Sequence, residues 1–376
     1  MKLIIDNKIK EPAKRPFAVI MKCSEACNYR CGYCYVEKHS AKDIMDVRTA
    51  DLVIEKVLQF VGPGRKVNFV WHGGEPLLAG RSFFENIARL SSAYRNNPIE
   101  HCIQTNGSLL TEELLDFFNR ENFLVSISLD GPRELHDLHR RKKDGSGTFA
   151  EVMRAVNLLR SKNAFAACVA VLHKGTIERI EDIYHFFVQH GIHFRINPVV
   201  KSGRAVSRYN ELAITAAEYG EAMCRLFDLW FSDTGKIQVE PLHTILGNFI
   251  APTVWGCDFH GKCLETIISI NPDGTVYPCG RFAGLEEFKL GDIENNDLPE
   301  MFATDVYKRL QTRSLETVPG CSGCEFAEIC NTGCMITAHM ARGNILDRDY
   351  YCQGRKKIFR HIAARLEEHL HRIEVA

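Results

Sequence analysis

The sequence predicts an α/β protein in which a parallel sheet is followed by a small cysteine-rich region. Two observations predict it. Six short apolar segments alternate with amphipathic helical patterns over the first two-thirds of the 376 residues, and twelve of the 15 cysteines gather in two groups, one near each end. Because each helix returns the chain to the same strand direction, six such units in series predict a parallel sheet. The periodicity alone leaves open whether this sheet is doubly wound or forms a complete or partial barrel.

The apolar segments predict strands because they are short and bounded by polar residues. The predicted strands are 17–21, 67–71, 100–104, 124–129, 165–172 and 193–199. Between and after them, apolar residues recur at helical spacing. The predicted helices are 49–62, 81–95, 111–121, 148–161, 177–189 and 215–232.

Two of these helices have recognisable starts. Thr111 is followed by two glutamates, which predicts an N-cap with an acidic first turn. Thr148 and Glu151 have the spacing of a capping box, in which each side chain bonds to the other residue's backbone N–H.

The pattern changes after about residue 250, where cysteines become dense and strands short. Asn-Pro-Asp-Gly at 271–274 predicts a hairpin turn between strands 267–270 and 275–277. A helical pattern returns at 353–371. We therefore expect three parts: a sheet domain over 1–235, a linker and cysteine-rich domain over 236–353, and a C-terminal helix over 354–376.

Composition excludes several classes of protein. Lys plus Arg and Asp plus Glu both number 47, so the bulk charge does not indicate a nucleic-acid surface. The longest apolar run, 165–172, is far shorter than the roughly 20 residues of a membrane span. The N-terminus has no signal-peptide core. We expect a cytoplasmic protein without a nucleic-acid or membrane partner.

The first cysteine group, Cys27, Cys31 and Cys34, lies just after the first strand. Three thiolates on one loop can converge on one metal centre, and a structural zinc site needs four ligands. Cys23 is the nearest fourth thiol, but its direction is set by the strand. A cubane iron–sulfur cluster with three protein ligands keeps one iron open. The spacing favours such a cluster and leaves zinc as the alternative.

This Cys-x3-Cys-x2-Cys loop resembles that of the radical S-adenosylmethionine (radical SAM) superfamily. The resemblance implies a partial (β/α)6 barrel in which Cys27, Cys31 and Cys34 hold a 4Fe-4S cluster. The open iron would bind S-adenosyl-L-methionine (AdoMet), whose cleavage gives a 5′-deoxyadenosyl radical that abstracts hydrogen from a substrate.

Gly-Gly-Glu-Pro at 73–76 follows the second strand. Two glycines permit close backbone approach to a ligand, and a carboxylate can accept from an ammonium. By resemblance, Gly73, Gly74 and Glu75 receive the amino group of AdoMet.

Further positions lie where ligand sites of parallel sheets gather, at carboxyl ends of strands. By resemblance, Ser128 faces the ribose of AdoMet and Arg140 its carboxylate region. Tyr33 and Val199 would flank the adenosyl part.

The second cysteine group resembles the SPASM domain of peptide-modifying radical enzymes, which binds two auxiliary 4Fe-4S clusters. Two structural zinc sites are the alternative. By resemblance the chain crosses over between the clusters. The first auxiliary cluster would be held by Cys257, Cys263, Cys279 and Cys334. The second would be held by Cys321, Cys324, Cys330 and Cys352. Four-thiolate ligation closes both clusters to substrate, which favours electron transfer, with an electron donor such as flavodoxin or ferredoxin.

From Met21 to Cys352 the chain is most similar to anaerobic sulfatase-maturating enzymes and to relatives that modify ribosomal peptides. The former oxidise a Cys or Ser of a sulfatase to formylglycine. Their general base is an aspartate directly after the third cysteine of the first auxiliary cluster, where this chain has Gly280. The residue before Gly-Gly-Glu-Pro, usually glutamine in those enzymes, is His72.

Because of these two differences, Gly280 and His72, we rank formylglycine formation below other reactions on a peptide. We expect a crosslink or other two-electron oxidation of a peptide side chain, with formylglycine formation second. Glu240, His243 and Asp258 are the candidate bases. We nominate Glu240, a carboxylate in an apolar segment, because desolvation makes a carboxylate more basic. A zinc-stabilised binding module without chemistry is the alternative from another class.

Only 26 residues precede Cys27, whereas a peptide-recognition domain needs about 80. We expect the barrel mouth, the SPASM surface or a separate chain to hold the peptide.

Overall fold

The sheet of this protein runs in chain order from β1 to β7. The computed structural model describes residues 15–36, 43–162, 164, 167–233, 236–251 and 253–375. Neighbouring strands among these seven are all parallel. They are β1 (Phe17–Ser24), β2 (Val67–Gly73), β3 (Ile99–Thr105), β4 (Phe123–Ser128), β5 (Ala167–Leu172), β6 (His193–Pro198) and β7 (Val239–Glu240). A doubly wound sheet reverses its strand order. The unreversed order is therefore that of a partial barrel, which confirms the predicted fold class.

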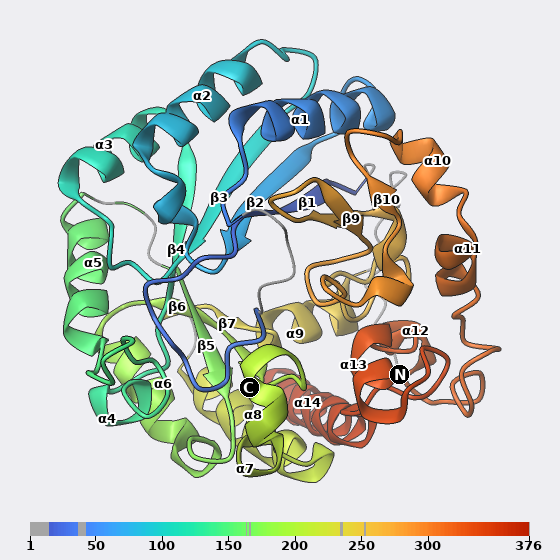
Figure 1. The fold of residues 1–376 in the computed structure, drawn as a ribbon. Helices are drawn as coiled ribbons and strands as arrows, with labels where there is room; N and C mark the ends of the chain where they lie inside the picture. The colour runs from blue at the N-terminus through green and yellow to red at the C-terminus, as the bar shows by residue number, and fades with distance from the viewer. Residues whose placement is uncertain are drawn as a thin grey trace.

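Helices cover the outside of this barrel (Figure 1). The six predicted helices are confirmed to within a few residues. They are α1 (Val47–Val61), α2 (Arg81–Ser92), α3 (Glu112–Arg120), α5 (Phe149–Ser161), α6 (Ile180–Gln189) and α8 (Ala216–Ser232). The six strands are confirmed as well, although residues 165 and 166 of the fifth lie outside the described residues. The seventh, β7, has two residues, too few for a periodic pattern.

The two predicted helix starts have different outcomes. The Thr111 side chain accepts from the Leu114 N–H, so that N-cap is confirmed. The capping box at Thr148 is wrong, because its side chain makes no cap hydrogen bond. The Thr148 hydroxyl donates instead to the Arg140 carbonyl at 2.8 Å, and Glu151 accepts from the Tyr29 hydroxyl at 2.8 Å.

The predicted hairpin is confirmed, with β8 (Ile267–Ile270) antiparallel to β9 (Thr275–Tyr277). A further strand, β10 (Gly291–Asp292), pairs with β9. β8 also pairs in parallel with β1. One continuous sheet therefore crosses the boundary predicted near residue 235, and Figure 1 shows the hairpin beside β1.

Short helices surround the cysteine-rich loops and the barrel mouth. They are α4 (Arg133–His136), α7 (Tyr209–Leu212), α9 (Leu242–Ile250), α10 (Leu298–Phe302), α11 (Asp305–Gln311), α12 (Ala327–Cys330) and α13 (Met335–Arg342).

The C-terminal helix α14 (Cys352–Val375) returns to the barrel and packs on α8. Its Gly354 allows a close backbone approach, since a Cβ there would lie 2.2 Å from the Ala216 carbonyl oxygen. The predicted helix is thus confirmed, and it packs against a helix of the barrel. In the described ranges, no helix has both the length and the apolar character needed to cross a membrane.

Candidate functional site

A pocket of about 230 Å³ lies at the carboxyl ends of the barrel strands. Six of the seven residues predicted to contact AdoMet line it: Tyr33, Gly73, Gly74, Ser128, Arg140 and Val199. Further polar side chains in its lining are Tyr35, His72, Gln104, Asn106, Asn197 and Arg281. The parallel strands therefore bring together loops that are far apart in the sequence.

Three thiols line this pocket from the loop after β1: Cys27, Cys31 and Cys34. Cys23 does not join them, because it is fully buried and its thiol lies 3.8 Å from the His72 carbonyl and 3.9 Å from that of Pro76. The structure thus provides three thiols at the pocket and keeps the nearest fourth apart. This donor set fits a cluster that keeps one open iron.

The two glycines after β2 let that strand end lie against the cysteine loop. A Cβ on Gly73, whose φ is +132°, would lie 2.0 Å from the Ser24 carbonyl oxygen, and one on Gly74 would lie 2.3 Å from that of Ala26. The Gly74 N–H donates to Ser24 at 2.6 Å, and the Glu75 N–H donates to Ala26 at 2.9 Å. No larger residue fits this backbone contact.

Glu75 is fully buried and does not line the pocket. Its carboxylate accepts from the Thr105 hydroxyl at 2.6 Å, from the Asn106 N–H at 2.8 Å and from the Leu77 N–H at 3.0 Å. Burial raises the pKa of Glu75 to about 7, against the lowering effect of these hydrogen bonds. The carboxylate therefore ties the end of β2 to the end of β3.

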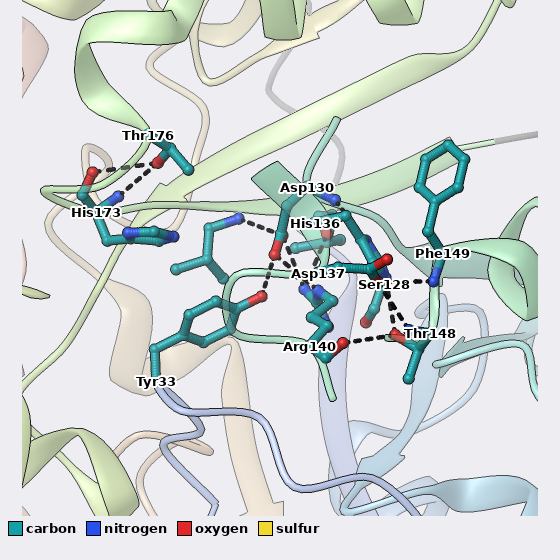
Figure 2. Close-up of polar contacts among 12 residues, drawn as sticks. Tyr33, Ser128, Asp130, His136, Asp137, Arg140, Thr148, Phe149, His173 and Thr176 are labelled. Atoms are coloured by element: carbon teal, nitrogen blue, oxygen red, sulfur yellow. Dashed lines mark hydrogen bonds and ion pairs between the residues drawn. The ribbon is translucent and has the colours of Figure 1, made fainter. Parts of the chain in front are cut away.

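Arg140 lies in a buried ion pair with Asp130 (Figure 2). Its Nε is 2.9 Å from Asp130 Oδ2 and its Nη2 is 3.1 Å from Oδ1. The Tyr33 hydroxyl and the Val171 N–H also donate to this carboxylate. Burial alone would raise the pKa of Asp130, but the guanidinium holds it below its ordinary value. Asp130 was not predicted as a partner of Arg140, because their pairing depends on the turn between them.

The same network explains the missing capping box at Thr148. His136 Nδ1 accepts from the Asp130 N–H at 3.3 Å, and its Nε2 lies 3.0 Å from the Thr148 hydroxyl. Asp137 accepts from the Thr148 N–H at 2.8 Å, so it caps α5 in place of Thr148 (Figure 2). The turn after β4 is held by buried polar side chains.

The eight cysteines of the second group are predicted to form two sets of four. One set lines a single small pocket: Cys321, Cys324, Cys330 and Cys352. In the other, burial and then charge on Cys334 and Cys279 raise the pKa of the Cys263 thiol to about 12. Burial and, to a smaller extent, charge on the thiols of Cys334, Cys263 and Cys279 likewise raise the pKa of Cys257. Among the described residues, no three His, Cys, Asp or Glu side chains are close enough to hold a single metal ion.

A left-handed turn separates Cys330 from Cys334. Three consecutive residues have positive φ: Asn331 (46°), Thr332 (74°) and Gly333 (70°). Such a φ is strained for a β-branched residue. Arg313 stabilises Thr332 here, donating to its carbonyl at 2.8 Å and to its hydroxyl at 3.1 Å. The turn redirects the chain between two cysteines that the prediction places in different sets. The hydrogen bonds of Arg313 to this turn were not predicted from the sequence.

Glu240, the nominated base, is not among the residues that line the pocket. It lies on β7, where it accepts from the Thr244 hydroxyl at 2.7 Å and lies 3.8 Å from Arg195. The structure gives this nomination no support.

The comparisons with known proteins agree with this geometry. The Radical SAM superfamily model matches residues 21–187, and the SPASM model, an iron–sulfur cluster-binding domain, matches residues 257–325. The serine-type anaerobic sulfatase-maturating enzyme of Bacteroides thetaiotaomicron is 30% identical over 94% of this chain and 91% of its own. The chain belongs to the radical SAM enzymes with a SPASM domain. Its radical SAM domain binds AdoMet and its SPASM domain binds iron–sulfur clusters, which confirms the predicted cofactors and favours them over zinc.

Other relatives match along most of the radical SAM–SPASM chain. The cysteine-type anaerobic sulfatase-maturating enzyme of Clostridium perfringens is 29% identical over 93% of this chain and 97% of its own. The structure of anSMEcpe with bound AdoMet matches with a TM-score of 0.83 and 26% identity, covering 94% of this chain and 99% of that one. Streptococcus suis SuiB with its precursor peptide SuiA matches with a TM-score of 0.66 and 18% identity, covering 90% and 76%, which shows a shared fold.

We predict that Asp130→Ala lowers the free energy of unfolding by about 3–5 kcal/mol, because it leaves a buried guanidinium without its partner. Denaturant unfolding of the anaerobically purified protein measures this. The double variant Asp130→Ala/Arg140→Met should recover most of the loss. Asp182→Ala, which breaks an exposed pair with Arg179, is the control and should cost no more than about 1 kcal/mol. Equal stability of the Asp130 and Asp182 variants would contradict the prediction.

Proposed function

We propose that this protein oxidises a residue of a peptide or protein substrate by two electrons, through crosslinking or a related reaction. One observation supports it above the others. The pocket has the Cys27, Cys31 and Cys34 thiols in its lining together with Arg281, whose guanidinium contacts Cys334 of the first auxiliary set. A substrate in this pocket would lie between the radical cluster and the first auxiliary cluster. The bound peptides named with the structures of anSMEcpe and SuiB support a peptide substrate.

Within this proposal the three pocket thiols hold the radical cluster. When bound, the cluster and AdoMet supply a 5′-deoxyadenosyl radical, and the auxiliary clusters supply a route for the second electron. Arg140 has one terminal nitrogen, Nη1, that does not bond to Asp130, and we assign it to the carboxylate of AdoMet. Ser128 accepts from Gln104 at 3.1 Å, which leaves its own O–H able to donate, and we assign this hydroxyl to the ribose. Tyr33 and Val199 supply apolar walls for the adenosyl part.

Two further assignments follow for the backbone and the auxiliary sets. The peptide groups of Gly73 and Gly74 meet the amino group of AdoMet, and Glu75 fixes their position from behind the pocket. The first auxiliary cluster is held by Cys257, Cys263, Cys279 and Cys334. The second is held by Cys321, Cys324, Cys330 and Cys352. The proton released by the substrate goes to a group other than Gly280, which has no side chain to accept it.

Formylglycine formation is the second candidate, and the sulfatase-maturating relatives favour it. It requires a base near the first auxiliary set. Among the described residues that line the pocket there is no Asp or Glu. Any two-electron oxidation needs a proton acceptor, so the ranking rests on Gly280, which stands where the sulfatase-maturating enzymes are expected to have their aspartate base.

The product distinguishes the two candidates. We predict that peptides encoded beside the gene lose two hydrogen atoms per 5′-deoxyadenosine formed, measured by mass spectrometry after anaerobic incubation with AdoMet and a reductant. A sulfatase-derived Cys or Ser peptide should remain unmodified. Appearance of an aldehyde on that peptide would instead establish formylglycine formation.

Replacing Cys27, Cys31 and Cys34 together by Ala should abolish 5′-deoxyadenosine formation and leave about eight of about twelve irons per chain. Cys23→Ala is the matched control, because this thiol faces backbone carbonyls away from the pocket, and it should keep AdoMet cleavage. Cleavage by the triple variant would contradict the assignment of these ligands.

Cys334→Ala should damage the first auxiliary cluster, and Cys330→Ala the second, although the two residues are separated by a single turn. Electron paramagnetic resonance of the reduced variants distinguishes the two clusters. The crossover is wrong if both variants lose signals of the same cluster.

A further inference from the structure

Apart from the three cluster thiols, the described charged side chains that line the pocket are all positive. Its described lining contains two arginines, Arg140 and Arg281, and no Asp or Glu. The charge of Arg140 is matched by Asp130, which is buried behind it. The charge of Arg281 has no carboxylate partner in the pocket wall, and the negative groups that stabilise it do not line the pocket: Cys334, Asp258, Cys257 and Cys279.

The surroundings of Arg281 leave most of its donors available. A guanidinium has five N–H donors. In Arg281, Nη1 donates a hydrogen bond to the Cys334 sulfur at 4.0 Å. The carboxylate nearby, Asp258, pairs with Arg355 at 2.9 Å. In the described part of the chain, no carboxylate lies within ion-pair distance of Arg281. One edge of the guanidinium therefore faces the sulfur, and the side chain also borders the pocket.

A hydroxyl lies in the same pocket lining. His72 Nδ1 accepts from the Gly73 N–H at 2.5 Å, so its other nitrogen, Nε2, carries the ring proton. Nε2 lies 3.5 Å from the Tyr35 hydroxyl oxygen, which can accept from it. The Tyr35 O–H is then free to donate toward a ligand. Arg281 and Tyr35 together offer a cation and a neutral donor, the groups that bind a carboxylate.

We propose that Arg281 binds a carboxylate of the substrate, so that the peptide residue entering the pocket is acidic or is the C-terminal residue. This inference rests on the proposed peptide-modifying function and specifies its substrate class. AdoMet does not satisfy Arg281, because its own carboxylate is assigned to Arg140. A planar guanidinium binds a carboxylate through two parallel hydrogen bonds, which also fixes the orientation of the bound residue.

Short capped peptides test the proposal on the reconstituted holoenzyme with AdoMet bound. The probes are acetylated, amidated pentapeptides of alanine with a central Glu, Asp or Gln, and an all-alanine pentapeptide with a free C-terminal carboxylate. Binding is measured by anaerobic calorimetry. The wild type should bind at least one carboxylate peptide about tenfold more tightly than the Gln peptide, a difference of about 1.4 kcal/mol. Which carboxylate is preferred separates a side chain from a C-terminus.

The variants assign the effect to one side chain. Arg281→Gln should bring the ratio of affinities close to one, and Arg281→Lys should restore part of it. Arg120→Gln, which removes an exposed cation of α3 that lines neither the pocket nor the cysteine sets, should leave the ratio unchanged. Iron content and the resonance spectrum of each variant verify that the clusters are intact.

The proposal is overturned if the wild type binds Glu and Gln peptides equally or binds none of the peptides. It is also overturned if Arg281→Gln changes only the reduction potential of the first auxiliary cluster and keeps the ratio. Oxidation of a natural peptide without a carboxylate preference would leave the proposed function standing while removing this inference. Absence of AdoMet cleavage would remove the function itself.

Discussion

The structure depends on the parallel pairing of β1 to β6, because parallel strands end at the same edge of a sheet. Loops that follow β1, β2, β3, β4 and β6 therefore meet around one pocket, although they are spread over more than 170 residues of the sequence, from Cys27 to Val200. β8 pairs with the other edge of β1, which brings the loop carrying Cys279 and Arg281 to the same place. The sheet thus connects the two cysteine groups of the chain.

Buried carboxylates fix this arrangement from behind the pocket. Glu75 joins the ends of β2 and β3, and Asp130 joins the end of β4 to Tyr33 on the cysteine loop. Both carboxylates bond to groups of the protein itself. Apart from the three cluster thiols, the described pocket lining therefore has only positive and neutral side chains. The division has a physical reason. A carboxylate inside the pocket would repel the carboxylate of AdoMet, whereas one behind it can neutralise an arginine and keep it in place.

Local patterns in the sequence predicted the strands, the helices, the hairpin and the cysteine loop, because each depends on residues close together in the chain. Local patterns did not predict features that depend on contacts between residues far apart in the sequence. The capping box predicted at Thr148 does not form, because Thr148 makes hydrogen bonds with Asp137 and His136 instead. The pairing of β8 with β1 and the hydrogen bonds of Arg313 to Thr332 join segments that no periodicity connects. The division of the eight SPASM cysteines was predicted from the resemblance, since their spacing alone leaves several groupings open. Glu240 shows that an apolar sequence context does not predict whether a residue lies in the pocket.

We propose that the protein holds three clusters, of which only the one at Cys27, Cys31 and Cys34 contacts AdoMet. Mössbauer spectroscopy of protein reconstituted with ⁵⁷Fe tests it most directly. We expect about twelve irons per chain, and we expect added AdoMet to change the spectrum of one iron alone, the open iron of the radical cluster. A spectrum that AdoMet leaves unchanged, or one in which irons of the SPASM clusters respond, would contradict it.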